Sequence, residues 1–189
     1  WEKCGENFIA FEGKKSRKVM QRLDPIIAEL ERNHTVFRSI LVDLPQELVQ
    51  WRPSPEKWTI LEIVCHLRDE ESEDFRLRTK MTLENPDLAP PSIAPESWVL
   101  ERAYARQDYA TVVHEFLQAR EMSIQWLRSL EQPQWENAWV HPKAGPLKAS
   151  FFLQNWLAHD YLHLKQILQR KFNYLQEASQ HVLDYAGTW

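Results

Sequence analysis

The sequence predicts an all-α protein, a four-helix bundle with short extra helices in the connections. Its 189 residues include only four glycines, whereas most of the eleven prolines gather within 45–55, within 86–95 and at positions 133, 142 and 146, where they mark connections. Between these clusters lie four long segments with apolar residues at helical spacing, and patterns typical of strands are few. Four such segments bury their apolar faces most simply against one another, in an antiparallel or a crossover bundle.

The first two helices are predicted from their N-termini. Asp24 and Pro25 are typical of the start of a helix, and apolar residues follow at helical spacing to about Asp43. Thr59 and Glu62 form the pattern of a capping box, in which each side chain accepts a hydrogen bond from the backbone of the other residue. We therefore expect a second helix from this point to about Leu83.

The third helix is expected to follow Asp108 and to end before Pro133, and the fourth to follow Ser150. Residues 97–106 predict a short turn of their own between the second and third helices. Residues 176–185 predict a weaker helix that closes the chain.

The length of the chain fits one domain, which we place at residues 20–189. Residues 1–19 differ from the rest, because 13–17 are polar and basic and Met20 stands just before the first helix. We interpret residues 1–19 as an N-terminal extension, either a native arm or a non-native addition.

Composition narrows the class of function. The chain has 23 Lys and Arg against 27 Asp and Glu, a net charge of -4, which argues against nucleic acid as a partner and favours a small-molecule substrate. No apolar run reaches the roughly 18 residues of a membrane-spanning helix, so we expect a soluble, cytoplasmic protein without a membrane partner. The two cysteines exclude a disulfide framework and a thiolate zinc cluster, so a metal site must use histidines and carboxylates.

Three histidines are candidate metal ligands. His159 and His163 stand four residues apart in the fourth helix, so both project from one face, beside the apolar residues expected to face the interior. His66 lies between Ile63 and Leu67 on the inward side of the second helix, and bundle cores are where metal sites are built from facing helices. The alternative is that all three are histidines at the edge of the core, satisfied by hydrogen bonds.

Carboxylates accompany these histidines. Glu70 follows His66 by four residues and so shares its face, where it could accept a proton or hold an imidazole in one tautomer. For Glu70, and equally for Asp69 and Asp160, the alternative is a solvated helix surface. Three further side chains are candidates for lining the site, namely Trp58, Trp156 and Arg68.

Two stretches of the sequence together resemble a known family. One is Trp58-Thr59 followed by a helix with His66-x-x-Asp69, and the other is His141-Pro142-x-x-Gly145 followed by His159-x3-His163-x2-Gln166. They resemble the DinB/YfiT-like superfamily of bacterial four-helix-bundle metalloproteins, from about Met20 to Phe172. The resemblance implies that His66, His159 and His163 hold a divalent transition metal, with Zn, Ni, Fe and Mn all compatible with imidazole. Leu164 and Glu70 depart from the related branch, which often has a histidine and a neutral residue there, and this leaves branch and substrate open.

The resemblance implies an enzyme that transfers a low-molecular-weight thiol to an electrophilic small molecule through a metal-bound thiolate, and Glu70 is our candidate for taking the thiol proton. One alternative is a hydrolase that uses a metal-bound hydroxide, and another is a non-enzymatic metal-binding stress-response protein. Family members are often homodimers, and four tryptophans outside the helical stripes are compatible with an interface, unless loops fold over them: Trp98, Trp126, Trp135 and Trp139.

Overall fold

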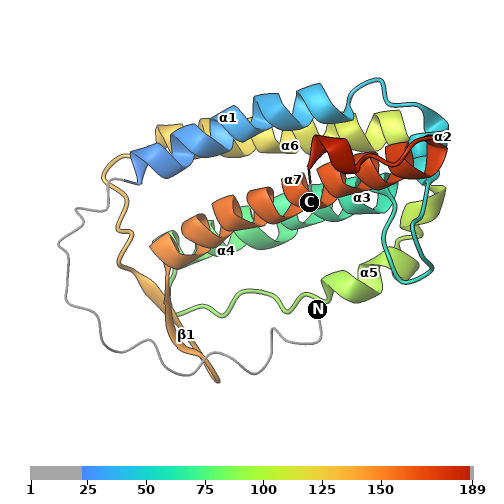
Figure 1. Ribbon diagram of the computed structural model, residues 1–189. Helices are drawn as coiled ribbons and strands as arrows, with labels where there is room; N and C mark the ends of the chain where they lie inside the picture. The colour runs from blue at the N-terminus through green and yellow to red at the C-terminus, as the bar shows by residue number, and fades with distance from the viewer. Residues whose placement is uncertain (1–22, 188–189) are drawn as a thin grey trace.

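The computed structural model describes residues 23–187, which form a bundle of four long helices (Figure 1). The first is α1 (Asp24–Leu41), and the second consists of three consecutive pieces, α3 (Ile60–Glu70), the π-helical turn η1 (Glu71–Phe75) and α4 (Arg76–Glu84). The other two are α6 (Tyr109–Ser129) and α7 (Ala149–Ala178). The predicted all-α four-helix bundle is confirmed, while the predicted extension, residues 1–19, lies outside the described residues.

The bundle is of the crossover type. In Figure 1, α1 and α7 run in one direction, whereas α3–α4 and α6 run in the other. The helices α4 and α6 belong to consecutive long helices of the bundle and run in the same direction. The chain must therefore travel back along the bundle between them. It does so through residues 85–108, here called the return segment, which contains the helix α5 (Pro95–Glu101) and the turn η2 (Tyr104–Arg106). A shorter connection with α2 (Gln46–Gln50) suffices between α1 and α3, which run in opposite directions.

The starts of α3 and α6 carry capping side chains, whereas α1 begins at Asp24 with Leu23 in the N-cap position and no side-chain cap. Thr59 Oγ1 accepts a hydrogen bond from the Glu62 backbone and the Glu62 side chain accepts one from the Thr59 backbone, so the capping box is present. Asp108 caps α6 through the backbone N–H of Thr111. The predicted separate helix over 176–185 is wrong, because α7 continues without a break to Ala178 and only Asp184–Ala186 forms a further 3-10 turn.

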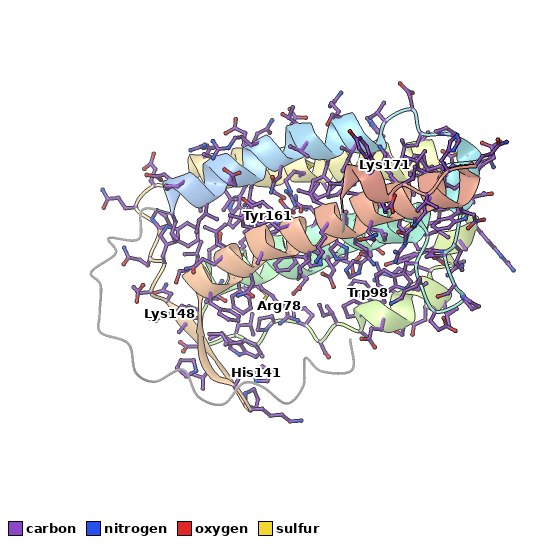
Figure 2. All side chains as sticks on the ribbon, in the orientation of Figure 1. Arg78, Trp98, His141, Lys148, Tyr161 and Lys171 are labelled. Atoms are coloured by element: carbon purple, nitrogen blue, oxygen red, sulfur yellow. The ribbon has the colours of Figure 1, made fainter. Side chains whose placement is uncertain are left out.

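A small hairpin joins α6 to α7. Its strands, β1 (Ala138–His141) and β2 (Gly145–Lys148), pair antiparallel, and Gly145 has the positive φ that the turn requires. These four-residue strands were not predicted, because patterns typical of strands are few in the sequence. His141 Nδ1 accepts hydrogen bonds from the backbone of Lys143 and Ala144 within this turn, outside the bundle (Figure 2).

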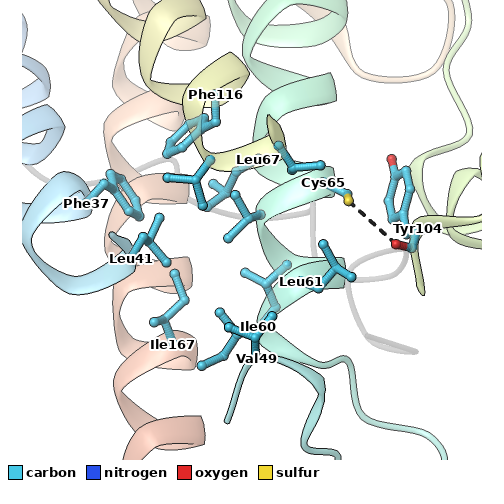
Figure 3. Close-up of a cluster of buried hydrophobic side chains, with 14 of the residues drawn as sticks. Phe37, Leu41, Val49, Ile60, Leu61, Cys65, Leu67, Tyr104, Phe116 and Ile167 are labelled. Carbon is cyan, nitrogen blue, oxygen red and sulfur yellow. Dashed lines mark hydrogen bonds between the residues drawn. The ribbon is translucent and has the colours of Figure 1, made fainter. Parts of the chain in front are cut away.

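The core consists of two apolar clusters separated by a polar layer. One cluster, shown in Figure 3, joins α1, α3, α6 and α7, and the other lies toward the start of α1 and of α7. On α1, α6 and α7 most of the buried polar residues fall between the two clusters in sequence, and Ser150 and Arg170 on α7 are the exceptions. Those between the clusters are Asn33 on α1, Arg120 and Ser123 on α6, and His159, Asp160 and His163 on α7. Cys65 belongs to the first cluster, and its Sγ contacts the Tyr104 carbonyl.

The four tryptophans considered for an interface are packed within the chain. Trp98 is buried beneath the guanidinium of Arg102, Trp126 and Trp135 pack against the second cluster, and Trp139 is half-buried with its ring against His141. The elements around them therefore cover these rings, and the homodimer stays a prediction. None of the helices described between residues 23 and 187 combines the length and apolar content that a membrane-spanning segment needs.

Candidate metal centre

Three buried imidazoles from two neighbouring helices converge at the middle of the bundle. His66 lies on α3, and His159 and His163 lie one turn apart on α7, which runs alongside α3 in the opposite direction. The Nε2 atom of His159 is 3.3 Å from Nε2 of His66 and 2.9 Å from Nε2 of His163. The sequence prediction that these three residues share one site is thus matched by their placement.

The arrangement fits a metal ion. One ligand atom from each histidine lies within 4.8 Å of the other two. A tetrahedral ion at about 2.0–2.1 Å from each nitrogen requires separations of roughly 3.3 Å between them, close to the spacing found. The three residues therefore fit a metal ion held between their Nε2 atoms.

Burial keeps the three imidazoles neutral, as metal ligands must be. It lowers the pKa of His66, His159 and His163 to about 3 in each case, with neighbouring histidines adding to the effect at His66 and His163. Gln166 Oε1 lies 2.8 Å from His163 Nδ1, so this nitrogen carries the proton and Nε2 presents its lone pair to the centre.

Glu70 brings a carboxylate to the same point. Its Oε2 atom is 2.9 Å from Nε2 of His159 and 3.6 Å from Nε2 of His66. The side chain is buried, and this burial raises its pKa. The alternative of a solvated surface charge is therefore wrong for Glu70.

The π-helical turn explains how the following residues reach the site. The backbone N–H of Arg76 bonds to the carbonyl of Glu71, five residues back, which inserts an extra residue into the turn. In an uninterrupted α-helix Asp74 would follow Glu70 on the inward face. The turn places Phe75 there instead, with its ring centroid 4.8 Å from that of His159 and stacked on Trp156. An apolar ring thus closes one side of the centre.

A fully buried ionic network holds the residues next to His159 and Glu70 in the sequence. Arg120 donates two hydrogen bonds to Glu71 and two to Asp160, the residues that directly follow Glu70 and His159. Trp156 Nε1 also donates to Glu71, and Asn33 donates to Asp160. A solvated surface is therefore wrong for Asp160 as well. Sequence reasoning missed this network, because Arg120 is 49 residues from Glu71 and 40 from Asp160 and no local spacing links them.

Of the three residues predicted to line the site, only some lie beside it. Trp58 contacts it, with its ring centroid 5.0 Å from that of His66, and Trp156 lies behind Phe75. Arg68 points elsewhere, toward Asp69, Gln107 and Glu115. Asp69 is buried and accepts hydrogen bonds from Tyr104 and Arg102, so it ties the return segment to α3. The surface interpretation fails for Asp69 too.

The fold and the site together define a four-helix-bundle protein whose two facing helices carry a three-histidine centre able to hold a metal ion. The family model of the DinB superfamily matches residues 29–167, and the chain belongs to this superfamily.

A solved structure, that of YfiT from Bacillus subtilis, superposes with a TM-score of 0.72 at 17% sequence identity, covering 87% of this chain and 93% of that one. YfiT is described as a probable metal-dependent hydrolase with an unusual four-helix bundle topology. At this identity the likeness shows a shared fold. No curated protein matches the chain.

Proposed function

We propose that this protein is a metal-dependent enzyme that transfers a low-molecular-weight thiol to an electrophilic small molecule. The observation that carries the proposal is the convergence of three neutral imidazole nitrogens beside one buried carboxylate. The family membership and the description of YfiT as metal-dependent support the metal requirement.

His66, His159 and His163 would hold the metal through their Nε2 atoms. Three neutral protein ligands are typical of catalytic sites, because they leave the ion its full charge and an open position. A divalent ion held in this way lowers the pKa of a bound thiol or water. Zn, Ni, Fe and Mn all accept imidazole, and a measurement must decide among them.

Glu70 is the group that would receive the thiol proton. Its Oε2 atom lies 2.9 Å from the Nε2 atom of His159, within reach of a substrate atom that approaches the three nitrogens. Burial raises the pKa of Glu70, which makes the carboxylate a stronger base than an exposed glutamate. The rings of Phe75 and Trp58 flank the histidines and keep water away from the transferred proton.

Two other functions each have one observation in their favour. Hydrolysis is favoured by the description of YfiT, and the same geometry would let Glu70 take a proton from water. A non-enzymatic metal-binding role is favoured by the enclosure of the histidines, the most exposed of which, His159, shows only 8% of its surface.

The deciding experiment combines metal analysis of the purified protein with two assays on the same preparation. One follows the consumption of several cellular thiols with an aromatic chloride as electrophile, and the other follows hydrolysis of an activated ester. Metal-dependent thiol consumption that a chelator abolishes supports the proposal. Ester hydrolysis alone would favour the hydrolase, and bound metal with neither activity would favour the non-enzymatic role.

A further inference from the structure

Arg170 on α7 is a buried guanidinium without a carboxylate partner among residues 23–187. Only 6% of its surface is exposed, and its one hydrogen bond runs from Nε to the backbone carbonyl of Trp58, at 2.9 Å. Burial accordingly lowers its pKa. Arg120 is buried as well, but there Asp160 and Glu71 outweigh the desolvation and raise the pKa. Because buried charges in proteins are normally paired, Arg170 lacks the anion that its position calls for.

Arg170 faces the same side of α7 as the histidine pair. It follows His163 by seven residues, or two turns, which is a rise of roughly 10 Å along the helix. Side chains in a helix lean toward its N-terminus, so the guanidinium reaches back in the direction of His163.

Trp58 connects the two places. Its ring contacts the ring of His66, and its carbonyl accepts the hydrogen bond from Arg170. Since α3 and α7 run in opposite directions, Trp58, eight residues before His66, lies beside Arg170 while its ring extends toward the histidines. The half-buried indole therefore covers the interval between the centre and the guanidinium.

The two residues that contact Trp58 have unused hydrogen-bond donors. His66 Nδ1 is fully enclosed and has no partner in the described part of the chain. Neither Nη atom of Arg170 has a partner there, and neither belongs to the completely enclosed unpartnered atoms, so both border space that water can enter. The enclosed His66 nitrogen is closed to a ligand, whereas the two Nη donors of Arg170, beside Trp58, suit an anionic ligand with an apolar body.

We propose that Arg170 binds a carboxylate of the substrate, whose thiol end reaches the histidine centre and whose connecting chain lies on Trp58. This rests on the proposed function and names the class of thiol: an ω-mercaptocarboxylate, with the sulfur and the carboxylate separated by several bonds. One guanidinium in an apolar surrounding matches the single charge of a carboxylate better than the double charge of a phosphate monoester.

The test uses a series of thiols in which the distance between the sulfur and the carboxylate is varied. The protein is loaded with Co²⁺, and the sulfur-to-cobalt absorption band reports binding of ω-mercaptocarboxylates with two to five methylenes and of the matching ω-mercaptoalcohols. In the unaltered protein we expect the longer acids to bind about 10-fold or more tightly than the matching alcohols, the value of one charge-assisted hydrogen bond. Arg170→Gln should abolish this preference without weakening the alcohols, and Arg170→Lys should restore part of it. Lys165→Gln, which removes an exposed charge from the same helix, should leave the preference intact.

Other outcomes separate the two proposals. If acid and alcohol bind equally to the unaltered protein, or if Arg170→Gln weakens both equally, the carboxylate site is refuted while thiol binding stands. If no thiol produces the cobalt band, the proposed function fails, and hexanoate is then compared with hexanol by tryptophan fluorescence. A preference for hexanoate that Arg170→Gln removes would still support the site, and no preference would overturn it.

A stability measurement distinguishes ligand binding by Arg170 from a purely structural role. Arg170→Met removes the unpaired buried charge and keeps much of the side-chain volume, so the urea midpoint of the metal-free protein should stay the same or rise. A marked fall in that midpoint, together with an unchanged ligand preference, would assign Arg170 to the fold.

Discussion

Arg120 holds Asp160 through two hydrogen bonds of 2.7 Å, and Asp160 is the residue that follows His159. The same guanidinium holds Glu71, which follows Glu70. One arginine on α6 thus fixes two helical turns, each of which presents a neighbouring side chain to the histidine centre. The position of the centre therefore depends on a residue that does not touch it.

Removing Arg120 should destabilise the protein strongly. Arg120→Met leaves Glu71 and Asp160 buried without their cation, and breaking a buried ion pair in this way typically costs about 3–5 kcal/mol. Urea unfolding followed by circular dichroism measures the loss. Arg128→Met is the matched control, because Arg128 on the same helix pairs with Glu31 at the exposed surface and should cost less than about 1 kcal/mol. Equal losses in the two variants would contradict the role given to the network.

Removing His66 should remove the metal. His66→Ala deletes the ligand from α3 and leaves two imidazoles on one helix, so most of the stoichiometric metal should be lost while the helical signal is largely retained. Elemental analysis after dialysis provides the measurement, and His114→Ala, an exposed histidine on α6, serves as control. Full metal content in His66→Ala would reject the three-histidine centre.

Glu70→Gln should separate catalysis from metal binding. The amide keeps the size of the side chain but cannot take the thiol proton, and loss of a general base typically lowers the rate by about 10²–10⁴-fold. We expect thiol transfer to fall by this amount while the metal stays bound. Glu121→Gln, on the exposed side of α6, is the control. If Glu70→Gln keeps full activity, water or the substrate is the base.

Acid should destabilise the metal-free protein through the buried histidines. In the folded state the pKa of His66 is about 3, well below its ordinary value of 6.5, so below pH 6.5 the unfolded chain binds a proton that the folded protein does not. The stability that depends on neutral His66 is thus present above about pH 6.5 and is lost as the pH falls toward 3, by about 1.4 kcal/mol per pH unit.

The raised pKa of Glu70 and of Asp74 acts in the opposite direction, so the contribution of His66 must be isolated by difference. Urea unfolding between about pH 6 and pH 4 should show a shallower loss of stability for His66→Leu than for the unaltered protein. His114→Leu should keep the original slope. Parallel curves for the unaltered protein and His66→Leu would mean that His66 is not held neutral.

The homodimer is tested by sedimentation velocity at micromolar concentration. The family resemblance predicts a species of twice the chain mass, whereas a single species of 22.6 kDa would reject the dimer. The tryptophans first considered for an interface are packed against their own chain, so they do not support it.

The parts of the site that obey helical spacing could be predicted from the sequence. His159 and His163 are four residues apart, as are His66 and Glu70, and such pairs share a face in any α-helix. The apolar neighbours of these residues then indicate the inward side. For the same reason the four helices and the capped starts of α3 and α6 were predictable, because each signal lies within a few residues.

What sequence reasoning missed depends on distant or non-helical geometry. The run from Asp69 to Glu71 reads as a solvated surface, and only the packing of α6 and of the return segment supplies the partners that allow burial. The π-helical turn contains no glycine or proline from which it could be predicted. Because of this turn, Phe75 and not Asp74 faces His159. The hairpin strands of four residues each are too short for a clear alternating pattern.

The polar layer between the two apolar clusters also sets the register of the helices. Apolar side chains alone would tolerate a slip of α7 by one turn along its neighbours α1 and α4, because one apolar side chain can replace another at such a contact. That slip would place the carboxylate of Asp160 opposite Phe116 or Ile124, one turn from Arg120 on either side, and would leave charges buried without partners. The alignment that pairs Arg120 with Asp160 is the one that brings His159 and His163 level with His66, so a single choice of register both pairs the charges and assembles the centre.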